Sequence, residues 1–325
     1  MHRFSIATLA FLLTASTAEA APEEDVRYQS DVSLAAALLL PERTGPSPAA
    51  VIVQGSGSSD RTNAWARSIA DLFVARGVAV LLTDKRGSGQ SGGDWKVAGF
   101  DELAKDAAAG VDYLKSRKEV DSRRIGLIGL SQGGWIVPMA AVRRPDVAFV
   151  VNLSGATVSF AEQSFLEMRN TARQAGLSAD GVNQIIELNK AAGRYILGGS
   201  WDDYAAMRAA AMKGAAKPVA AGFPDSKAAP AWTFLRKVGA HDPTAYWSMV
   251  EQPVFIGLGE RDEEDNVPVG ESVRRVEHAF GATGKKNYDV VVAPGAGHAL
   301  WNEKREFAPL LIERLDAWLK QYVKN

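Results

Sequence analysis

The sequence contains no cysteine among its 325 residues. This absence excludes disulfide bonds, a thiolate nucleophile and a thiolate metal site. Histidine is scarce too, with four in the whole chain, so a reaction that needs an imidazole base has few candidates. An excess of positive charge is also missing, because 37 Lys and Arg residues are balanced by 38 Asp and Glu residues. The formal net charge of -1 argues against nucleic acid or an anionic membrane surface as a partner.

Long apolar runs are equally rare. The N-terminus carries one from Phe4 to Leu13, preceded by Arg3 and followed by the small-x-small triplet Ala18-Glu19-Ala20. The run is too short to span a bilayer, and its flanks are typical of an export signal rather than of a buried N-terminal helix. We therefore predict a signal peptide over residues 1–20 with cleavage near Ala20. The mature chain is expected to be periplasmic or secreted and to contain no membrane span.

The most informative stretch is Gly129-Leu130-Ser131-Gln132-Gly133. A short apolar run, residues 124–128, precedes it, and an apolar segment suited to a buried helix, residues 136–142, follows it. A serine at the apex of such a strand, turn and helix is held in strained geometry with its hydroxyl exposed, which predicts Ser131 as a nucleophile. A second G-x-S-x-G match contains Ser91. It has no strand before it and no helix directly after it, so we interpret Ser91 as a loop residue.

Strand-like and helix-like segments alternate on both sides of Ser131. Apolar runs predict strands at residues 26–40, 49–53, 78–83, 148–153, 253–258 and 288–293, and helical spacing marks residues 65–74, 101–118, 269–280 and 304–322. Several strands lack polar alternation, which indicates a mostly parallel sheet covered by helices on both faces. Between them, β-branched runs stop and the pattern becomes helical. We therefore predict core segments over residues 21–155 and 248–325 and a helical cap insertion over residues 156–247.

Acyl transfer by serine needs a general base, and imidazole has a suitable pKa. His298 is the candidate, because it follows the predicted strand 288–293 in a glycine-rich loop, at the sheet edge where ligands bind in open α/β folds. A carboxylate must hold the ring in the right tautomer. Asp262 comes soon after the strand 253–258 and is the favoured acid, with Asp265 as the alternative. The chain order Ser131, Asp262, His298 matches the hydrolase ordering.

Two backbone donors are needed for the oxyanion that forms on the attacked carbonyl. The amide of Gln132 is placed by the turn itself, at the start of a helix whose dipole favours negative charge. The second donor is expected from the loop after residues 49–53, where we choose Ser56, with Gly55 or Gly57 as alternatives. A phosphate cradle would also use such a Gly/Ser loop. The Lys-Ser/Thr ending of a P-loop is absent, however, so nucleotide binding is not expected.

These motifs together resemble bacterial α/β-hydrolase esterases, near the serine aminopeptidases and the prolyl-oligopeptidase-like hydrolases. The resemblance rests on residues 51–57, 84–91, 129–135, 259–262 and 297–298, and it covers residues 26–153 and 253–325. It implies an α/β-hydrolase fold with Ser131 as nucleophile, Asp262 as acid and His298 as base. It also implies that the helical insertion acts as a cap.

We therefore predict an exported serine hydrolase that cleaves a small-molecule ester or other acyl substrate through an acyl-enzyme, with no cofactor and no metal. The alternatives are a peptidase or amidase, similar to a small aminopeptidase, and an acyl thioesterase that uses the same triad. Trp135 and Trp301 lie close in sequence to triad residues, so they are candidates for the pocket wall or, equally, packed aromatics. The sequence leaves the oligomeric state open.

Overall fold

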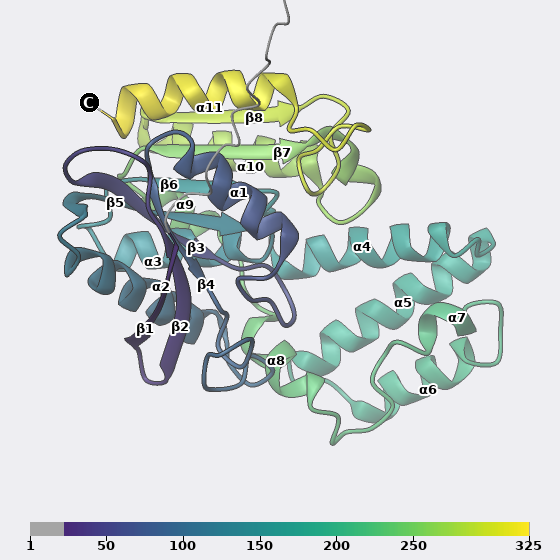
Figure 1. Cartoon of the computed structure of the whole chain (residues 1–325). Helices are drawn as coiled ribbons and strands as arrows, with labels where there is room; N and C mark the ends of the chain where they lie inside the picture. Colours follow the sequence, from purple (N-terminus) through teal and green to yellow (C-terminus); the bar gives the residue numbers. More distant parts are fainter. Residues whose placement is uncertain (1–22, 325) are drawn as a thin grey trace, which may run out of the picture.

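The chain folds around one sheet whose strands run in the order β1-β2-β4-β3-β5-β6-β7-β8 (Figure 1). A computed structural model describes residues 23–324, so the predicted signal peptide lies outside the described residues. The strands are β1 Glu23–Gln29, β2 Ser33–Leu39, β3 Ser47–Val53, β4 Ala79–Thr83, β5 Val120–Leu130, β6 Val150–Leu153, β7 Val254–Gly259 and β8 Tyr288–Ala293. The strands β3 to β8 are parallel, and the β1–β2 hairpin joins antiparallel beside β4. The predicted, mostly parallel sheet is confirmed.

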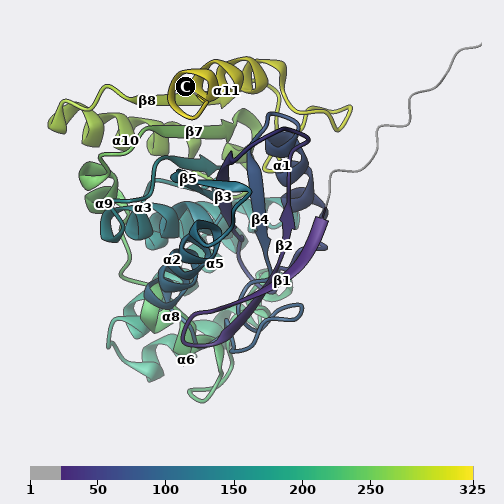
Figure 2. The ribbon, with the colours of Figure 1, turned by 60° about the vertical axis from the view of Figure 1, so that its left-hand side comes forward.

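Helices cover both faces of this sheet. One face carries α1 Ala64–Val74 and α11 Pro309–Tyr322, and the other carries α2 Phe100–Lys115, α3 Gly133–Arg143, α9 Thr244–Met249 and α10 Val269–Thr283. Figure 2 shows the β1–β2 hairpin at one edge of the sheet and β8 with α11 at the other. The sheet is therefore buried on two sides, which is why its central strands read as continuous apolar runs.

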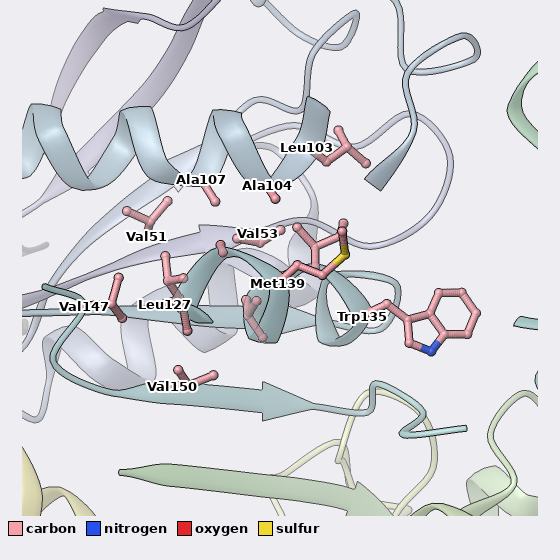
Figure 3. Close-up of a cluster of buried hydrophobic side chains, with 14 of the residues drawn as sticks. Val51, Val53, Leu103, Ala104, Ala107, Leu127, Trp135, Met139, Val147 and Val150 are labelled. Carbon is pink, nitrogen blue, oxygen red and sulfur yellow. The ribbon is translucent and has the colours of Figure 1, made fainter. Parts of the chain in front are cut away.

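The alternation of side chains along β3 builds both cores at once. All seven residues of β3 are buried; Val51 packs toward α2 and α3, whereas Ile52 packs toward α1 and α11. Figure 3 shows the first of these cores, with Leu127 of β5 and Met139 of α3 among its members. Trp135 lies at the end of this cluster toward which the strand arrows point (Figure 3). This end of the sheet is where the loops that carry the predicted site residues emerge.

An insertion of helices separates β6 from β7. It comprises α4 Phe160–Gln174, α5 Ala179–Ile196, α6 Trp201–Ala211, α7 Lys217–Ala220 and α8 Ala231–Val238, and it extends from the arrowhead side of the sheet (Figure 1). The insertion has an apolar cluster of its own, in which Tyr195, Tyr204 and Trp232 meet at ring centroid distances between 4.9 and 6.1 Å. The next helix, α9, crosses the predicted boundary at residue 247 and packs against α10 of the core. No helix between residues 23 and 324 combines the length and apolar character needed to cross a membrane.

His241 lies where the insertion returns to the core. Its ring meets Phe100 edge-on at 4.9 Å and Tyr246 in a stacked arrangement at 6.0 Å. Its Nε2 atom is buried without a hydrogen-bond partner in the described part of the chain. Burial lowers the pKa of His241 to about 4, although Asp242 and Asp101 act in the opposite direction.

This environment predicts acid sensitivity. Since the pKa of His241 is lower in the folded chain than its ordinary value, its contribution to stability is complete above about pH 6.5 and is lost as the pH falls toward 4. Between pH 7.5 and 4.5, we expect the unfolding free energy of H241F to fall by about 2 kcal/mol less than that of the wild type, as measured by urea denaturation. His278→Asn, at an exposed position on α10, is the matched control and is expected to keep the wild-type pH dependence. An H241F variant as acid-sensitive as the wild type would contradict this account.

Candidate active site

The turn at Ser131 is as sharp as its glycines suggest. β5 ends at Leu130 and α3 begins at Gly133, and Ser131 has a φ of 50°, in the left-handed region that serine rarely adopts. A Cβ on Gly133 would lie 2.2 Å from the carbonyl oxygen of Val53, and one on Gly129 would lie 2.5 Å from that of Gly133. Only glycine fits at these two positions. The turn therefore holds Ser131 above the end of the sheet, as the motif predicts.

The second G-x-S-x-G serine has a different environment. The hydroxyl of Ser91 donates to the carbonyl oxygen of Asp84 at 2.8 Å and accepts from the backbone amide of Ala35 at 2.9 Å. The bond from Ala35 holds the loop after β4 against β2, and the bond to Asp84 lies within that loop. Ser91 thus braces a loop, which agrees with its interpretation from sequence.

The structure pairs His298 with Asp262. His298 Nδ1 lies 2.6 Å from Asp262 Oδ2, and the Asp262 side chain is fully buried in the short 3₁₀ helix η1 Glu260–Glu264 that follows β7. Because an ionised carboxylate can only accept, this contact places a proton on Nδ1 and leaves Nε2 as the basic nitrogen. Asp265, the alternative acid, is exposed. The choice of Asp262 over Asp265 as the catalytic acid stays a prediction, and the pairing favours it.

The loop that carries His298 is fastened to the neighbouring strand ends. Ser154, which follows β6, donates its hydroxyl to the carbonyl oxygen of His298 at 2.6 Å. Ser131 donates its amide to Leu153, the last residue of β6, at 2.9 Å. Trp65 of α1 also packs on the imidazole, with the two ring centroids 5.3 Å apart. Ser131 and His298 are thus both tied to the end of β6.

No hydrogen bond joins the Ser131 hydroxyl to the His298 imidazole among the described residues. Catalytic hydrogen bonds are often long in a site without substrate and tighten when the substrate is bound. The arrangement therefore has the predicted acid and the predicted base in contact, at the same edge of the sheet as the predicted nucleophile.

The predicted oxyanion donors come from the loop after β3, which contains Ser56, and from Gln132, which directly follows Ser131. A Cβ added to Gly55 would lie 3.5 Å from the Ser131 Cβ, so the loop after β3 passes directly beside the predicted nucleophile. Neither the Ser56 amide nor the Gln132 amide donates a hydrogen bond to another described residue. Two unengaged N–H groups beside a strained serine are what an oxyanion hole requires.

The two predicted tryptophans occupy different surroundings. Trp135 is 5% exposed, donates its Nε1–H to the carbonyl oxygen of Val158 at 3.1 Å, and packs against Phe100 and Phe160. Little of its indole is left to meet a substrate. Trp301 is half-buried and lines a polar cleft of about 450 Å³ together with His298 and the acidic loop after β7. Contact of either side chain with substrate stays a prediction.

A second cavity lies in the insertion. It measures about 410 Å³ and is lined mainly by apolar side chains of α4, α5, α8 and the segment after α5, among them Phe160, Leu197 and Leu235. Phe160 also packs against Trp135, with ring centroids 5.7 Å apart, and Trp135 lies in the first turn of the helix after Ser131. One aromatic pair therefore connects this cavity to the turn that carries the predicted nucleophile.

Two charged residues near the site were not predicted from the sequence. Lys85 follows β4 and reaches the Gln132 side chain, and Glu167 of α4 lies one turn before Asn170, whose amide donates to the carbonyl oxygens of Glu263 and Asp265 at 3.0 and 3.2 Å. Lys85 stands in the segment 84–91 that carried the resemblance, but its reach across the sheet is not visible in a sequence. Glu167 belongs to the insertion, whose packing could not be derived.

A bound metal ion would need several ligating side chains close together. Within residues 23–324, no group of three or more His, Cys, Asp or Glu side chains is arranged to hold a metal ion. The absence of a metal or cofactor from the reaction stays an expectation from the sequence.

Comparisons with known proteins place this geometry in context. A family model described as X-Pro dipeptidyl-peptidase (S15 family) matches residues 30–269. The quorum-quenching protein AidA of Acinetobacter baumannii is 29% identical over 156 residues, which are 47% of this chain and 51% of AidA. The esterase EstD of Thermotoga maritima is 32% identical over 111 residues, 33% of this chain and 26% of EstD. The chain thus covers about half or less of the curated relatives that it matches.

A solved structure extends the likeness of fold to almost the whole chain. The Pyrococcus furiosus esterase Pf2001 superposes with a TM-score of 0.60 at 19% identity, covering 93% of this chain and 92% of the esterase. At this identity the superposition establishes the shared α/β-hydrolase fold alone.

Proposed function

Because the chain belongs to the X-Pro dipeptidyl-peptidase (S15) family, we propose that it hydrolyses carboxylic esters through an acyl-enzyme formed on Ser131. The chain is a serine hydrolase of the α/β-hydrolase fold, as the family and the esterase relatives support. The observation that carries the finer proposal is the 2.6 Å contact between His298 Nδ1 and the buried Asp262 carboxylate, at the same edge of the sheet as the strained Ser131.

The proposed reaction follows from this arrangement. His298 Nε2 removes the hydroxyl proton of Ser131 as Oγ attacks the ester carbonyl, and Asp262 stabilises the imidazolium that results. The amides of Ser56 and Gln132 donate to the oxyanion of the tetrahedral intermediate. The imidazolium then protonates the departing alcohol, and a water activated by the same ring releases the acid from the acyl-enzyme.

The cavity in the insertion suits the acyl part of the substrate. Its lining is mostly apolar, and its volume of about 410 Å³ lies within the range of small-ligand pockets. We propose that the insertion, residues 156–247 in the sequence prediction, acts as a cap that supplies this pocket. Trp301 lines the polar cleft beside His298, which offers a place for the alcohol part.

A substrate panel tests the proposed function. We expect p-nitrophenyl esters of two to eight carbons to be hydrolysed faster than acyl thioesters and aminoacyl anilides, and a fluorophosphonate probe to label Ser131, as located by peptide mass spectrometry. Labelling of another serine, or no labelling of a folded chain that also turns over none of these substrates, would refute the proposal.

One observation favours a second function, the cleavage of peptides or amides that carry a free amine. Glu167 of α4 is partly buried and makes no hydrogen bond or ion pair with another described residue. Burial, and then the charge of Asp265, raise the pKa of its carboxyl group. Glu167 is close enough to His298 for their charges to interact. A substrate ammonium group would supply the positive partner that this carboxyl group lacks among the described residues. In the panel, this function predicts that aminoacyl anilides are cleaved faster than esters.

We also propose that the protein is exported. The proposal rests on the sequence of residues 1–20, with Arg3 before the apolar run and Ala18-Glu19-Ala20 after it. N-terminal sequencing of protein from the periplasmic or secreted fraction of the producing cell is expected to begin at Ala21. Protein that still begins at Met1 in that fraction would contradict this proposal.

A further inference from the structure

Lys85 connects the two halves of the predicted oxyanion hole. It follows β4 by two residues, and it is 7% exposed. Its Nζ donates to the carbonyl oxygen of Gly55 at 2.8 Å and to Oε1 of Gln132 at 2.7 Å. The ring of Trp95 lies beside the same ammonium, with its centroid 5.7 Å from Nζ. One side chain therefore binds both segments that carry the candidate donors.

The environment of Lys85 is unusual for a buried lysine. Its sequence neighbours form ion pairs, Asp84 with Arg61 and Arg86 with Asp106, whereas Lys85 has no carboxylate partner among the described residues. Burial lowers the pKa of Lys85 to about 7. A neutral amine still carries two N–H donors, enough for both oxygens, so the two hydrogen bonds do not require the charge.

The contact with Gly55 reaches the Ser56 amide through one peptide unit. The Gly55 carbonyl and the Ser56 N–H belong to the same planar group, and in a trans peptide they point in opposite directions. A donor that fixes the carbonyl oxygen therefore fixes the direction of the N–H. Hydrogen bonding at the oxygen also polarises the peptide and strengthens the N–H as a donor. The contact with Gln132 similarly restrains the residue that supplies the second amide.

We propose that Lys85 is a positioning residue of the oxyanion hole: its Nζ holds the Gly55–Ser56 peptide and Gln132 so that both backbone amides face the carbonyl oxygen of the substrate. The proposal rests on the function proposed for Ser131. Lys85 acts through these amides and does not touch the reacting atoms. Lys85 therefore stabilises the transition state, in which the oxyanion forms, and leaves the affinity for the uncharged ester unchanged.

Lys285 provides a matched control. It too is partly buried, burial lowers its pKa to about 8, and its Nζ donates to the carbonyl oxygens of Val250, Glu251 and Gln252 at 3.0, 3.3 and 2.6 Å. These residues lie before the amino end of β7, whereas Ser131 follows the carboxyl end of the parallel strand β5. Lys285 is therefore at the end of the sheet that is remote from Ser131. A lysine that only stabilises the fold would behave like Lys285.

Kinetics of Lys85→Met and Lys285→Met test the proposal on any ester that the wild type hydrolyses. We expect K85M to lower kcat about 10- to 100-fold while KM stays within about threefold, since loss of a whole oxyanion donor lowers kcat by about 10²- to 10³-fold. K85M is also expected to bind a trifluoromethyl ketone, which forms an oxyanion on Ser131, more weakly by a similar factor. K285M is expected to lower the melting temperature and to keep kcat within about twofold.

The absence of cysteine allows a chemical rescue. In Lys85→Cys, the introduced thiol is the one thiol of the chain. Alkylation of the unfolded variant with 2-bromoethylamine, followed by refolding, restores an amine at nearly the length of lysine, whereas alkylation with iodoethane adds a similar chain without the amine. We expect the aminoethylated protein to regain kcat to within about threefold of wild type refolded in the same way, and the ethylated protein to resemble K85M.

The outcomes separate this proposal from the one on which it rests. If a fluorophosphonate labels another serine of the wild type, or labels none while the folded chain turns over no substrate of the panel, the proposed function itself fails. If wild type is labelled but folded K85M keeps its kcat, or loses affinity for the ester with kcat unchanged, Lys85 has no positioning role. Equal rescue by the two alkylating reagents would assign its effect to packing and would also overturn the proposal.

Discussion

Replacement of Ser131 by alanine is expected to lower kcat for a p-nitrophenyl ester by a factor on the order of 10⁵ to 10⁶, because no acyl-enzyme can form without the hydroxyl. The change removes one oxygen atom that makes no hydrogen bond to another described residue, and it keeps the glycines that the sharp turn requires. The melting temperature is therefore expected to stay near that of the wild type. Initial rates at saturating ester, corrected for spontaneous hydrolysis, measure the effect.

Ser91→Ala is the matched control, because Ser91 stands in the second copy of the same motif. Its hydroxyl makes two hydrogen bonds, to Asp84 and from Ala35, so its loss is expected to lower the unfolding free energy by about 1–2 kcal/mol. kcat is expected to change little. Substantial turnover by purified S131A, or loss of turnover in S91A alone, would show that Ser131 is not the nucleophile.

Asp262→Asn is expected to lower kcat by a factor of about 10⁴. An asparagine amide can donate to Nδ1 of His298, which would favour the tautomer whose Nε2 carries the proton and cannot act as a base. The other carboxylate oxygen, Oδ1, accepts from the amide of Asn266 at 3.3 Å, so an asparagine would keep its oxygen there and turn its NH₂ group toward the ring. The pH dependence of kcat together with the residual rate measures the loss.

The corresponding change at Asp265 separates the two acids that the sequence left open. Asp265 is exposed, and its contact with α4 uses its backbone carbonyl oxygen, which accepts from Asn170. Asp265→Asn keeps that carbonyl, so we expect kcat to remain within about twofold of wild type. A large loss in D265N with a small one in D262N would reverse the assignment.

The fold was predictable where a single local pattern decides the structure. Each strand buried on both faces appears as a short apolar run, and the turn at Ser131 is recognisable because two of its glycines are sterically required. The parallel arrangement then brings the carboxyl ends of β5, β7 and β8 to one edge, which is why residues far apart in sequence could be assigned to one site.

Side-chain reach and local starts were harder to predict. The helix expected from residue 304 begins at Pro309, because Asn302 first organises a turn by accepting from the amides of Lys304 and Glu306. Lys85 belongs to the segment 84–91, and the sequence does not show that its side chain crosses to Gln132. Such contacts depend on how strands are ordered in space, and the strand order does not follow the order of the chain.

The position of β8 has a consequence for inactivation. β8 is the last strand of the sheet and pairs with β7 alone. Most of its residues are partly exposed, yet the loop that follows it in the chain carries His298. Edge elements open with less free energy than the centre of a domain does. Detachment of β8 would withdraw the imidazole while β3, β5 and β6 remain paired. Mild denaturant is thus expected to abolish turnover reversibly, before the tryptophan fluorescence of the core reports unfolding.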